Sequence, residues 1–245
     1  MLLKIVSQLD HDKFENYVIS LLGPGRLDES VMQQGGVVRH INLKSINVFG
    51  EMLKYFSLVR SIEPDVIQGW MYYGNLIALF GRAKKAKGKA TVIWNIRHSL
   101  SKFGKEKMAT RLLIWISGIL SKKTYAVIYN SSEAQETHIQ KGYERTKAKP
   151  IPNGFNTDLF SPNEINRLHY RKSLGINDDD LVFGVVARFH PDKGHANLLI
   201  AIKNCNISLD KIKFVFIGRD ADVDHFRQAN YIGENFATSS LICLG

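Results

Sequence analysis

Two cations stand five residues apart where an expected strand gives way to an expected helix. A run of apolar and β-branched residues starts at Leu181 and ends in Arg188, and Lys193 and Gly194 precede a new apolar periodicity. This pattern predicts a buried parallel strand, a short loop and a helix. Ligands of open α/β sheets bind beyond the carboxyl ends of strands, and helix N-termini favour anions. Arg188 and Lys193 could therefore hold a phosphorylated ligand, or could be solvated loop cations.

A second polar pair, Arg97 and His98, follows another apolar run at 90–96. A charged pair at the end of a buried strand fits the wall of a ligand cleft. A surface arginine beside a hydrogen-bonded histidine is the competing interpretation. The sequence does not decide which of the two side chains faces a ligand.

Metal ligation has little support in the sequence. His190 and His195 flank Lys193, but no cysteine or carboxylate pair accompanies them. The acidic triplet that begins at Asp220 lacks the glycine and the closing glutamate of a calcium loop. We therefore expect no metal and no cofactor.

The composition indicates one or two globular domains. The chain has 245 residues, of which 44% are hydrophobic. Its best apolar run, Leu112–Leu120, is far shorter than the roughly 20 residues that span a bilayer. The N-terminus lacks the pattern of a signal peptide, and two cysteines are too few for a disulfide framework. A cytoplasmic, reducing location is expected.

The formal net charge is +10, and part of it is concentrated in one segment. Such a patch can meet nucleic acid, anionic lipid or a phosphorylated substrate. Residues 101–123 combine cations with apolar side chains, as interfacial helices do, which favours contact with an anionic membrane surface. The same apolar side chains could belong to the core. No nucleic-acid module is visible, so nucleic acid is not an expected partner. The clustered cations are Arg82, Lys84, Lys85, Lys87, Lys89, Arg97, Lys102, Lys105, Lys107 and Arg111. The apolar residues are Leu112, Leu113, Trp115, Ile116, Ile119 and Leu120.

Strand-like and helix-like segments alternate along the chain, which predicts doubly wound parallel sheets. After a loop at 151–162 and a short helix the alternation restarts, so we expect an α/β fold with domains at 1–165 and 166–245. Expected strands are 16–22, 37–43, 64–68, 90–96, 126–130, 181–188, 213–217 and 241–244. Expected helices are 46–62, 74–84, 103–121, 132–140 and 164–173, besides the end of one at 1–9.

The amino-acid sequences of several segments are similar to those of a known family. ARFHPDKGHANLL at 187–199, preceded by IPNGFNTDLFSP at 151–162, closely resembles the retaining nucleotide-sugar glycosyltransferases of family four, which have the GT-B fold. Weaker similarity appears in PDVIQGWMYYGNLIA, WNIRHSL, YNSSEAQETHIQKGY and FVFIGRD. Their shared order is more specific than any one segment.

This resemblance implies roles for particular residues. In the family the Arg and Lys five residues apart hold the donor diphosphate, and a polar residue at the strand end near 98 lies by the sugar and acceptor. The expected catalytic residues are therefore Arg188, Lys193 and His98. Asn153 and Gly154 would line the interdomain cleft, although Asn-Gly alone is also typical of a hairpin turn. The expected donor-binding residues are Asn153, Gly154, Arg188, Lys193, Gly218 and Arg219.

The resemblance also implies a GT-B fold of two Rossmann-like domains, with the chain cut at both ends. Residues 1–165 would form the acceptor-side domain without its first strand and glycine-rich loop. Residues 166–245 would begin the donor-binding domain and stop before its carboxylate pair and closing helix. A sheet that stops there would leave apolar faces uncovered. The implied activity is transfer of a sugar from a nucleotide-sugar donor to a glycan or lipid-linked acceptor with retention, in a cell-surface polysaccharide pathway. A non-catalytic binding module and one half of a split enzyme stay open as alternatives.

Overall fold

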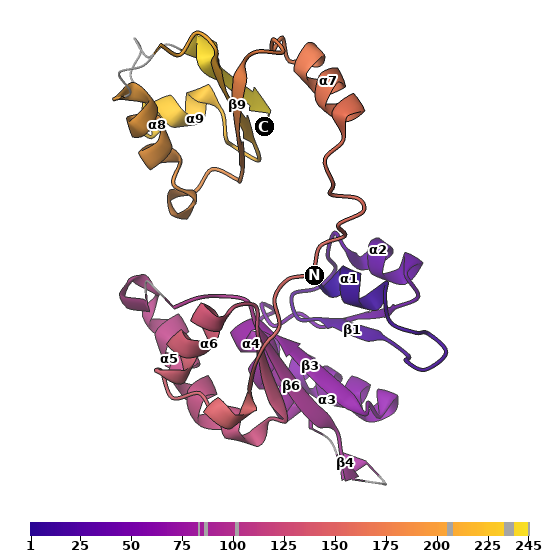
Figure 1. The fold of residues 1–245 in the computed structure, drawn as a ribbon. Coiled ribbons are helices and arrows are strands. Elements are labelled where there is room, and N and C mark those ends of the chain that lie inside the picture. The colour runs from indigo at the N-terminus through magenta and orange to yellow at the C-terminus, as the bar shows by residue number, and fades with distance from the viewer. Residues whose placement is uncertain (83, 86–87, 101–102, 205–207, 233–237, 245) are drawn as a thin grey trace. The chain divides into compact units, whose positions relative to one another are not determined.

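A computed structural model of the chain describes residues 1–82, 84–85, 88–100, 103–204, 208–232 and 238–244 (Figure 1). It divides into two compact units, Met1–Phe155 (unit 1) and Asn156–Gly245 (unit 2). The division precedes the boundary expected at 165/166, so the segment after Phe155 is grouped with unit 2. Each unit is an α/β structure with parallel strands, as the sequence predicts.

The main sheet of unit 1 is parallel, with strand order β3-β6-β7-β8. Its strands are β3 (Val66–Trp70), β6 (Thr91–Ile96), β7 (Ala126–Tyr129) and β8 (Ala148–Pro150). A separate parallel pair consists of β1 (Tyr17–Ser20) and β2 (Val37–His40). A short antiparallel pair consists of β4 (Lys84–Lys85) and β5 (Gly88–Lys89). The parallel register brings the ends of β6 and β7 together, with Ile96 opposite Tyr129.

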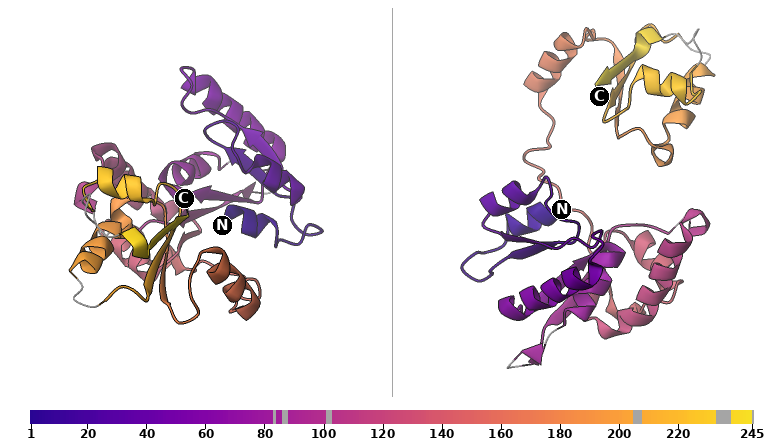
Figure 2. Two further views of the ribbon diagram at one scale, coloured as in Figure 1. Left: turned by 90° about the horizontal axis from the view of Figure 1, so that it is seen from above. Right: turned by 180° about the vertical axis from the view of Figure 1, so that it is seen from behind.

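Helices cover both faces of the main sheet. Figure 1 and Figure 2 show α3 (Val48–Ile62) on one side and α5 (Met108–Leu120) and α6 (Ser132–Ile139) on the other. Side-chain caps define two of these helices: the Asn47 side chain accepts from the Gly50 N–H, and the Ser131 side chain accepts from the Ala134 N–H. The other helices of unit 1 are α1 (Leu2–Val6), α2 (Asp28–Gln33) and α4 (Met71–Phe80).

The helix expected at 74–84 is wrong at both ends. Helix α4 starts directly after β3, with Met71 at a positive φ of 58°, and Lys84 belongs to β4. The turn is tight because Gly69 lies against the backbone of Asn75, where a Cβ would come within 2.5 Å. The helix expected at 103–121 is divided into a 3₁₀ turn at Phe103–Lys105 and α5. Strand β8 and helix α2 were not predicted, since both are short.

The core of unit 1 lies between the main sheet and its helices. Trp94 and Ile96 of β6, Tyr129 of β7 and Ile114 of α5 are fully buried. Parallel strands covered on both faces read as apolar runs, which is why β6 and β7 could be located from the sequence. A smaller cluster packs Tyr55 and Val59 of α3 against Ile41, which directly follows β2.

Unit 2 has one parallel sheet in the order β11-β10-β9. Its strands are β9 (Leu181–Val186), β10 (Ile212–Ile217) and β11 (Leu241–Leu244). Its helices are α7 (Glu164–Ser173), α8 (His195–Lys203) and α9 (Val223–Gln228), of which α9 was not predicted. Its core contains fully buried Leu199, Phe216 and Phe226.

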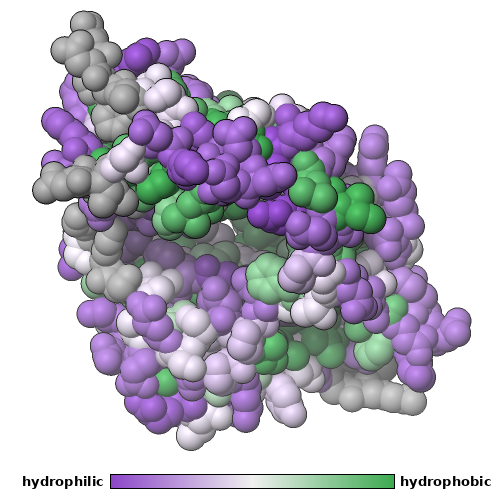
Figure 3. All heavy atoms as spheres, turned by 45° about the horizontal axis from the view of Figure 1, so that its top comes forward, coloured by the Kyte–Doolittle hydropathy of each residue, from purple (hydrophilic) through white to green (hydrophobic). Residues whose placement is uncertain are grey.

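Some apolar side chains of unit 2 stay uncovered. Val186, Ile217 and Leu244 are register partners across the sheet and are 79%, 40% and 41% exposed. On the face drawn in Figure 3, hydrophobic residues are interspersed among hydrophilic ones.

Candidate functional site

In unit 2, two neighbouring strand ends bring Arg188 beside Gly218 and Arg219. The Ala187 N–H donates to the Ile217 carbonyl at 2.9 Å, and the Phe189 N–H donates to the Arg219 carbonyl at 2.9 Å. These backbone hydrogen bonds continue the β9-β10 pairing beyond the strands. Three of the predicted site residues therefore share the carboxyl edge of this sheet.

Gly218 makes this close approach possible. Its φ is 148°, and a Cβ on it would lie 2.4 Å from the Ala187 carbonyl oxygen and 2.9 Å from the Arg188 nitrogen. Only glycine adopts such a conformation at no steric cost. The backbone position of Arg188 therefore depends on the absence of a side chain at 218.

Lys193 ends a single 3₁₀ turn between β9 and α8. The His190 side chain caps that turn by accepting from the Asp192 N–H at 3.3 Å. Gly194 follows in the left-handed region, with φ 75°, and is the N-cap of α8. Because the next residues begin a helix, their N–H groups have no intrahelical acceptors.

The edge of unit 2 is suited to an anion. The side chains of Arg188, Lys193 and Arg219 are all exposed. Arginine forms paired hydrogen bonds with phosphate oxygens, and a helix N-terminus adds N–H donors and a favourable dipole. A diphosphate is a chemical fit for this set of groups.

In unit 1, Arg97 and His98 follow β6 but have different neighbours. An Nη1 group of Arg97 donates to the Asn153 side-chain oxygen, and its guanidinium lies 5.3 Å from the centre of the Trp70 ring. Burial lowers the pKa of Arg97. Arg97 is thus attached to the segment that ends unit 1.

Asn153 and Gly154 lie in a stretch with no helix, strand or turn. The Gly154 carbonyl accepts from Lys4 Nζ at 3.2 Å, and the same Nζ lies 5.1 Å from the Phe155 ring centre. The hairpin-turn interpretation of Asn-Gly is therefore wrong. The segment is held instead by contacts from Arg97 and Lys4.

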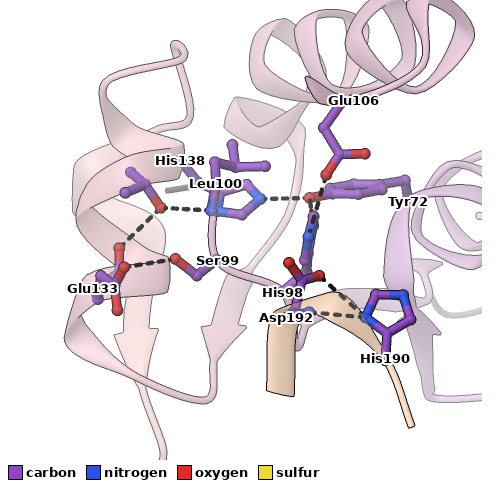
Figure 4. Close-up of polar contacts among 10 residues, drawn as sticks. Tyr72, His98, Ser99, Leu100, Glu106, Glu133, His138, His190 and Asp192 are labelled. Carbon is purple, nitrogen blue, oxygen red and sulfur yellow. Dashed lines mark hydrogen bonds and ion pairs between the residues drawn. The ribbon is translucent and has the colours of Figure 1, made fainter. Parts of the chain in front are cut away.

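His98 faces other partners (Figure 4). Its Nδ1 lies 3.2 Å from the Tyr72 hydroxyl, and its Nε2 lies 3.4 Å from Glu106 Oε1. The His98 side chain is 37% exposed, so it can be reached from solvent. The next residues fix the backbone onto α6, because Ser99 Oγ donates to Glu133 Oε1 at 2.9 Å and the Leu100 N–H donates to Thr137 Oγ1 at 3.3 Å.

Sequence reasoning missed three residues of this cluster: Tyr72, Glu106 and His138. His138 is fully buried, and its Nε2 lies 2.9 Å from the Tyr72 hydroxyl. The only local signal was a histidine on the inner face of a helix expected at 132–140. Neither Tyr72 nor Glu106 has a spacing that singles it out.

No metal site is apparent among the residues that the structure describes, where no three His, Cys, Asp or Glu side chains come together in a suitable way. His195 is buried among the rings of Phe189, Phe216 and Phe226. Asp222 caps α9 by accepting from the His225 N–H at 2.9 Å, so the acidic triplet starts a helix.

The fold and these groups define an α/β protein with cations at the strand ends, an arrangement suited to nucleotide ligands. The chain belongs to Glycosyltransferase Family 4, whose sequence pattern matches residues 1–159. The chain is 34% identical over 89 residues to putative glycosyltransferase EpsF of Bacillus subtilis (strain 168). These 89 residues are 36% of this chain and 23% of that protein.

Solved structures of GT-B type agree with this fold. Anabaena Alr3699/HepE in complex with UDP matches with a TM-score of 0.78 and 17% identity, over 100% of this chain and 64% of that one. Its complex with UDP and glucose matches with a TM-score of 0.72 and 18% identity, over 94% and 61%. The apo lipopolysaccharide outer core galactosyltransferase WaaB matches with a TM-score of 0.56 and 14% identity, over 90% and 55%. The chain thus spans less than two thirds of the length of each of these relatives.

Proposed function

We propose that this chain takes part in transferring a sugar from a nucleotide-sugar donor to a glycan or lipid-linked acceptor with retention, in cell-surface polysaccharide biosynthesis. The observation that carries the proposal is the set of exposed cations, Arg188 and Arg219 at neighbouring strand ends and Lys193 in the loop that leads to α8. Family membership supports it, as do the UDP complexes of HepE and the name of WaaB. Unit 1 would serve the acceptor and unit 2 the donor.

In the proposed reaction the bond between the anomeric carbon and the diphosphate oxygen breaks, and a bond from the acceptor oxygen forms on the same face. The acceptor hydroxyl proton passes to the departing phosphate. Negative charge grows on that phosphate, where Arg188 and Lys193 stabilise it. These cations act in place of a metal ion, and we propose no cofactor. Asn153, Gly154 and Gly218 offer backbone to the donor, and His98 acts at the sugar.

The test is calorimetric binding of UDP and GDP to the wild type and to the Arg188→Ala/Lys193→Ala variant. Charge-assisted hydrogen bonds contribute about 1.5–3 kcal/mol each, so the double variant should bind about 100-fold more weakly or not measurably. Both side chains are exposed, so folding should be unaffected. A matched control, Lys172→Ala/Lys203→Ala, removes two other exposed cations of unit 2 and should bind like the wild type. A folded wild type that binds neither nucleotide would refute the proposal for this chain.

We also propose that the chain lies at the cytoplasmic side of the membrane and contacts its anionic surface through α5. The exposed residues Met108, Leu112, Trp115 and Ile119 recur every three or four positions along this helix. The helix contains no acidic residue, and Arg111, Lys122 and Lys123 flank its exposed stripe. The described helices include none that could cross a bilayer.

The structure corrects the set of residues expected on this surface. Leu113 and Leu120 pack against the core of unit 1, and Ile116 is half-buried, so these three do not belong to the exposed stripe. Lys87 and Lys102 lie outside the described residues. Vesicles that include an anionic lipid should retain the wild type at low salt, whereas neutral vesicles should not. Trp115→Glu should abolish retention, and Phe49→Glu, a change at an exposed apolar residue of α3, should not. Equal retention of the two variants would contradict a role for α5.

A further inference from the structure

A chain of polar contacts runs through unit 1 from α6 to the loop before α5 (Figure 4). It starts at the Ala134 carbonyl and passes through His138, Tyr72 and His98 to Glu106. The contacts are 2.7, 2.9, 3.2 and 3.4 Å long in that order. Each imidazole ring and hydroxyl group in this series of contacts has few hydrogen-bond donors and acceptors. The donor and the acceptor of each hydrogen bond can therefore be identified.

The proton positions are fixed from the buried end. His138 Nδ1 lies 2.7 Å from the Ala134 carbonyl oxygen. A carbonyl can only accept, so Nδ1 must bear a hydrogen. Burial lowers the pKa of His138 to about 4, so the ring is neutral near pH 7. Its Nε2 therefore has no hydrogen and must accept from its neighbour.

That neighbour is the Tyr72 hydroxyl, 2.9 Å away. Burial raises the pKa of Tyr72, and the charge of Glu106 raises it further, so the hydroxyl keeps its hydrogen. This single hydrogen is donated to His138 Nε2. The oxygen of Tyr72 can then only accept at its contact with His98 Nδ1. His98 must donate from Nδ1.

We propose that His138 and Tyr72 are positioning residues that keep a hydrogen on His98 Nδ1, which leaves Nε2, beside Glu106, as the nitrogen that takes up and releases a proton. An imidazole without such a partner exchanges between two tautomers, and the hydrogen bond at one nitrogen selects which form is present. Here the selection begins at a helix carbonyl that solvent does not reach. The hydrogen bonds of the buried groups His138 and Tyr72 extend this selection to the solvent-accessible ring of His98.

Other charged or titratable groups surround His98. Glu106 faces Nε2 from the loop before α5, where its carboxylate can accept a hydrogen bond when both ring nitrogens bear hydrogen. Tyr72 faces Nδ1 from α4, and His138 of α6 is neutral. The carboxylate of Glu133 is engaged by the neighbouring Ser99 hydroxyl. A protonated Nε2 can donate a hydrogen bond to a sugar or phosphate oxygen, which is the use we assign to it if the proposed function holds.

The direct test is nuclear magnetic resonance of the full chain with ¹⁵N-labelled histidine. Long-range proton–nitrogen correlations distinguish a nitrogen that bears hydrogen from one that does not. The signals are assigned with His98→Gln and His138→Gln variants. In spectra where both rings are neutral, both should show hydrogen on Nδ1 and none on Nε2. Hydrogen on Nε2 of His98 under these conditions would overturn the proposal without any further variant.

The linkage between the two histidines is tested by Tyr72→Phe. This change removes the hydroxyl and keeps the ring, so neutral His98 should lose its single form and show both tautomers. The matched control is Tyr129→Phe, since Tyr129 is buried, its ring centre lies 5.5 Å from that of His138, and its hydroxyl makes no hydrogen bond in the described structure. Its spectrum should resemble that of the wild type. A single Nδ1–H form of His98 in the folded Tyr72→Phe variant would show that Tyr72 does not determine the tautomer.

These measurements need neither a nucleotide-sugar donor nor a sugar acceptor. If the chain fails to bind nucleotide, the tautomer of His98 can still be read, and only its use in sugar transfer is lost. If the tautomer is wrong, nucleotide binding by Arg188 and Lys193 of unit 2 is unaffected. The two failures can therefore be told apart.

Discussion

In unit 1 the candidate residue His98 is positioned by side chains, whereas in unit 2 Arg188 is positioned by backbone. His98 contacts Tyr72 and Glu106, and behind Tyr72 lies the fully buried His138. Arg188 is held where it is because the Ala187 and Phe189 N–H groups donate to the neighbouring strand end. Its own side chain, like that of Lys193, is exposed.

This difference suits different chemical tasks. A group that exchanges a proton needs a defined tautomer and a defined neighbour, which only other side chains provide. Cations that bind a diphosphate need to reach a charged ligand from a fixed base, and long exposed side chains do so when their backbone is rigid. We therefore expect the position of His98 in unit 1 to be sensitive to substitution of buried polar groups. The position of Arg188 in unit 2 should be sensitive to substitution of Gly218.

The largest expected effect is that of Gly218→Ala on unit 2. The new Cβ would lie 2.4 Å from a backbone oxygen, and alanine disfavours a φ of 148°. Strain and a forced shift of the β9 end should together cost about 3 kcal/mol of unit 2 stability. Hydrogen–deuterium exchange should show faster exchange in β9 and β10, and UDP binding should weaken because Arg188 moves.

Gly184→Ala is the control for this change. Gly184 lies in β9 itself, but a Cβ on it would meet no atom within 4 Å, and its φ is not in the left-handed region. Alanine there should be neutral, or stabilising by about 0.4–1 kcal/mol. Equal exchange rates in the two variants would mean that the backbone contact at 218 does not position Arg188.

A medium effect is expected from acid on unit 1. The pKa of His138 is about 4 in the folded state, below the ordinary value of 6.5 for a histidine, because the ring is buried. The unfolded chain therefore binds the proton first, so the free energy of unfolding falls as the pH drops from about 6.5 towards about 4. Lowering the pH from about 7 to about 5 should therefore reduce the free energy of unfolding by about 2 kcal/mol through the protonation of His138.

Urea unfolding at the two pH values checks this expectation. The three tryptophans, Trp70, Trp94 and Trp115, all lie in unit 1, so their fluorescence reports that unit alone. His138→Gln should show a pH difference smaller by about 2 kcal/mol, whatever its stability at neutral pH. His11→Gln, a change at an exposed histidine, should keep the full difference. If His138→Gln also keeps the full pH difference, buried His138 is not the cause of the loss of stability in acid.

The two units also differ in how much of them could be predicted from sequence. The cation edge of unit 2 was predicted because Arg188, Lys193 and the strand before them are local in the sequence, and the chain itself brings them together. The cluster of unit 1 was not predicted, because Tyr72 of α4 and His138 of α6 are 66 residues apart in the sequence and meet only in the folded unit. The early start of α4 depends on the positive φ of Met71, which a non-glycine residue seldom adopts. The directions of Arg97 and His98 depend on contacts with distant segments, so their order in the chain could not reveal them.

The smallest expected effect concerns the segment 153–154 of unit 1, which the side chains of Arg97 and Lys4 contact. Arg97 donates to Asn153, and Lys4 donates to Gly154 from the opposite end of the sequence of unit 1. If the first contact fixes this segment, Arg97→Ala and Asn153→Ala should each lower the free energy of unfolding, and the double variant should lose less than their sum. The coupling should be about 1 kcal/mol, since one partner is charged but partly exposed. Tryptophan-detected urea unfolding can measure it.

Lys4→Ala combined with Asn153→Ala is the comparison for this cycle, because Lys4 bonds to a backbone oxygen that the Asn153 change leaves in place. Those two changes should be additive within about 0.5 kcal/mol. Additivity in the Arg97 cycle as well would mean that the Asn153 side chain does not hold the segment. The segment 153–154 would then be positioned without help from the Asn153 side chain, and the contrast between the units would rest on His98 and the groups behind it.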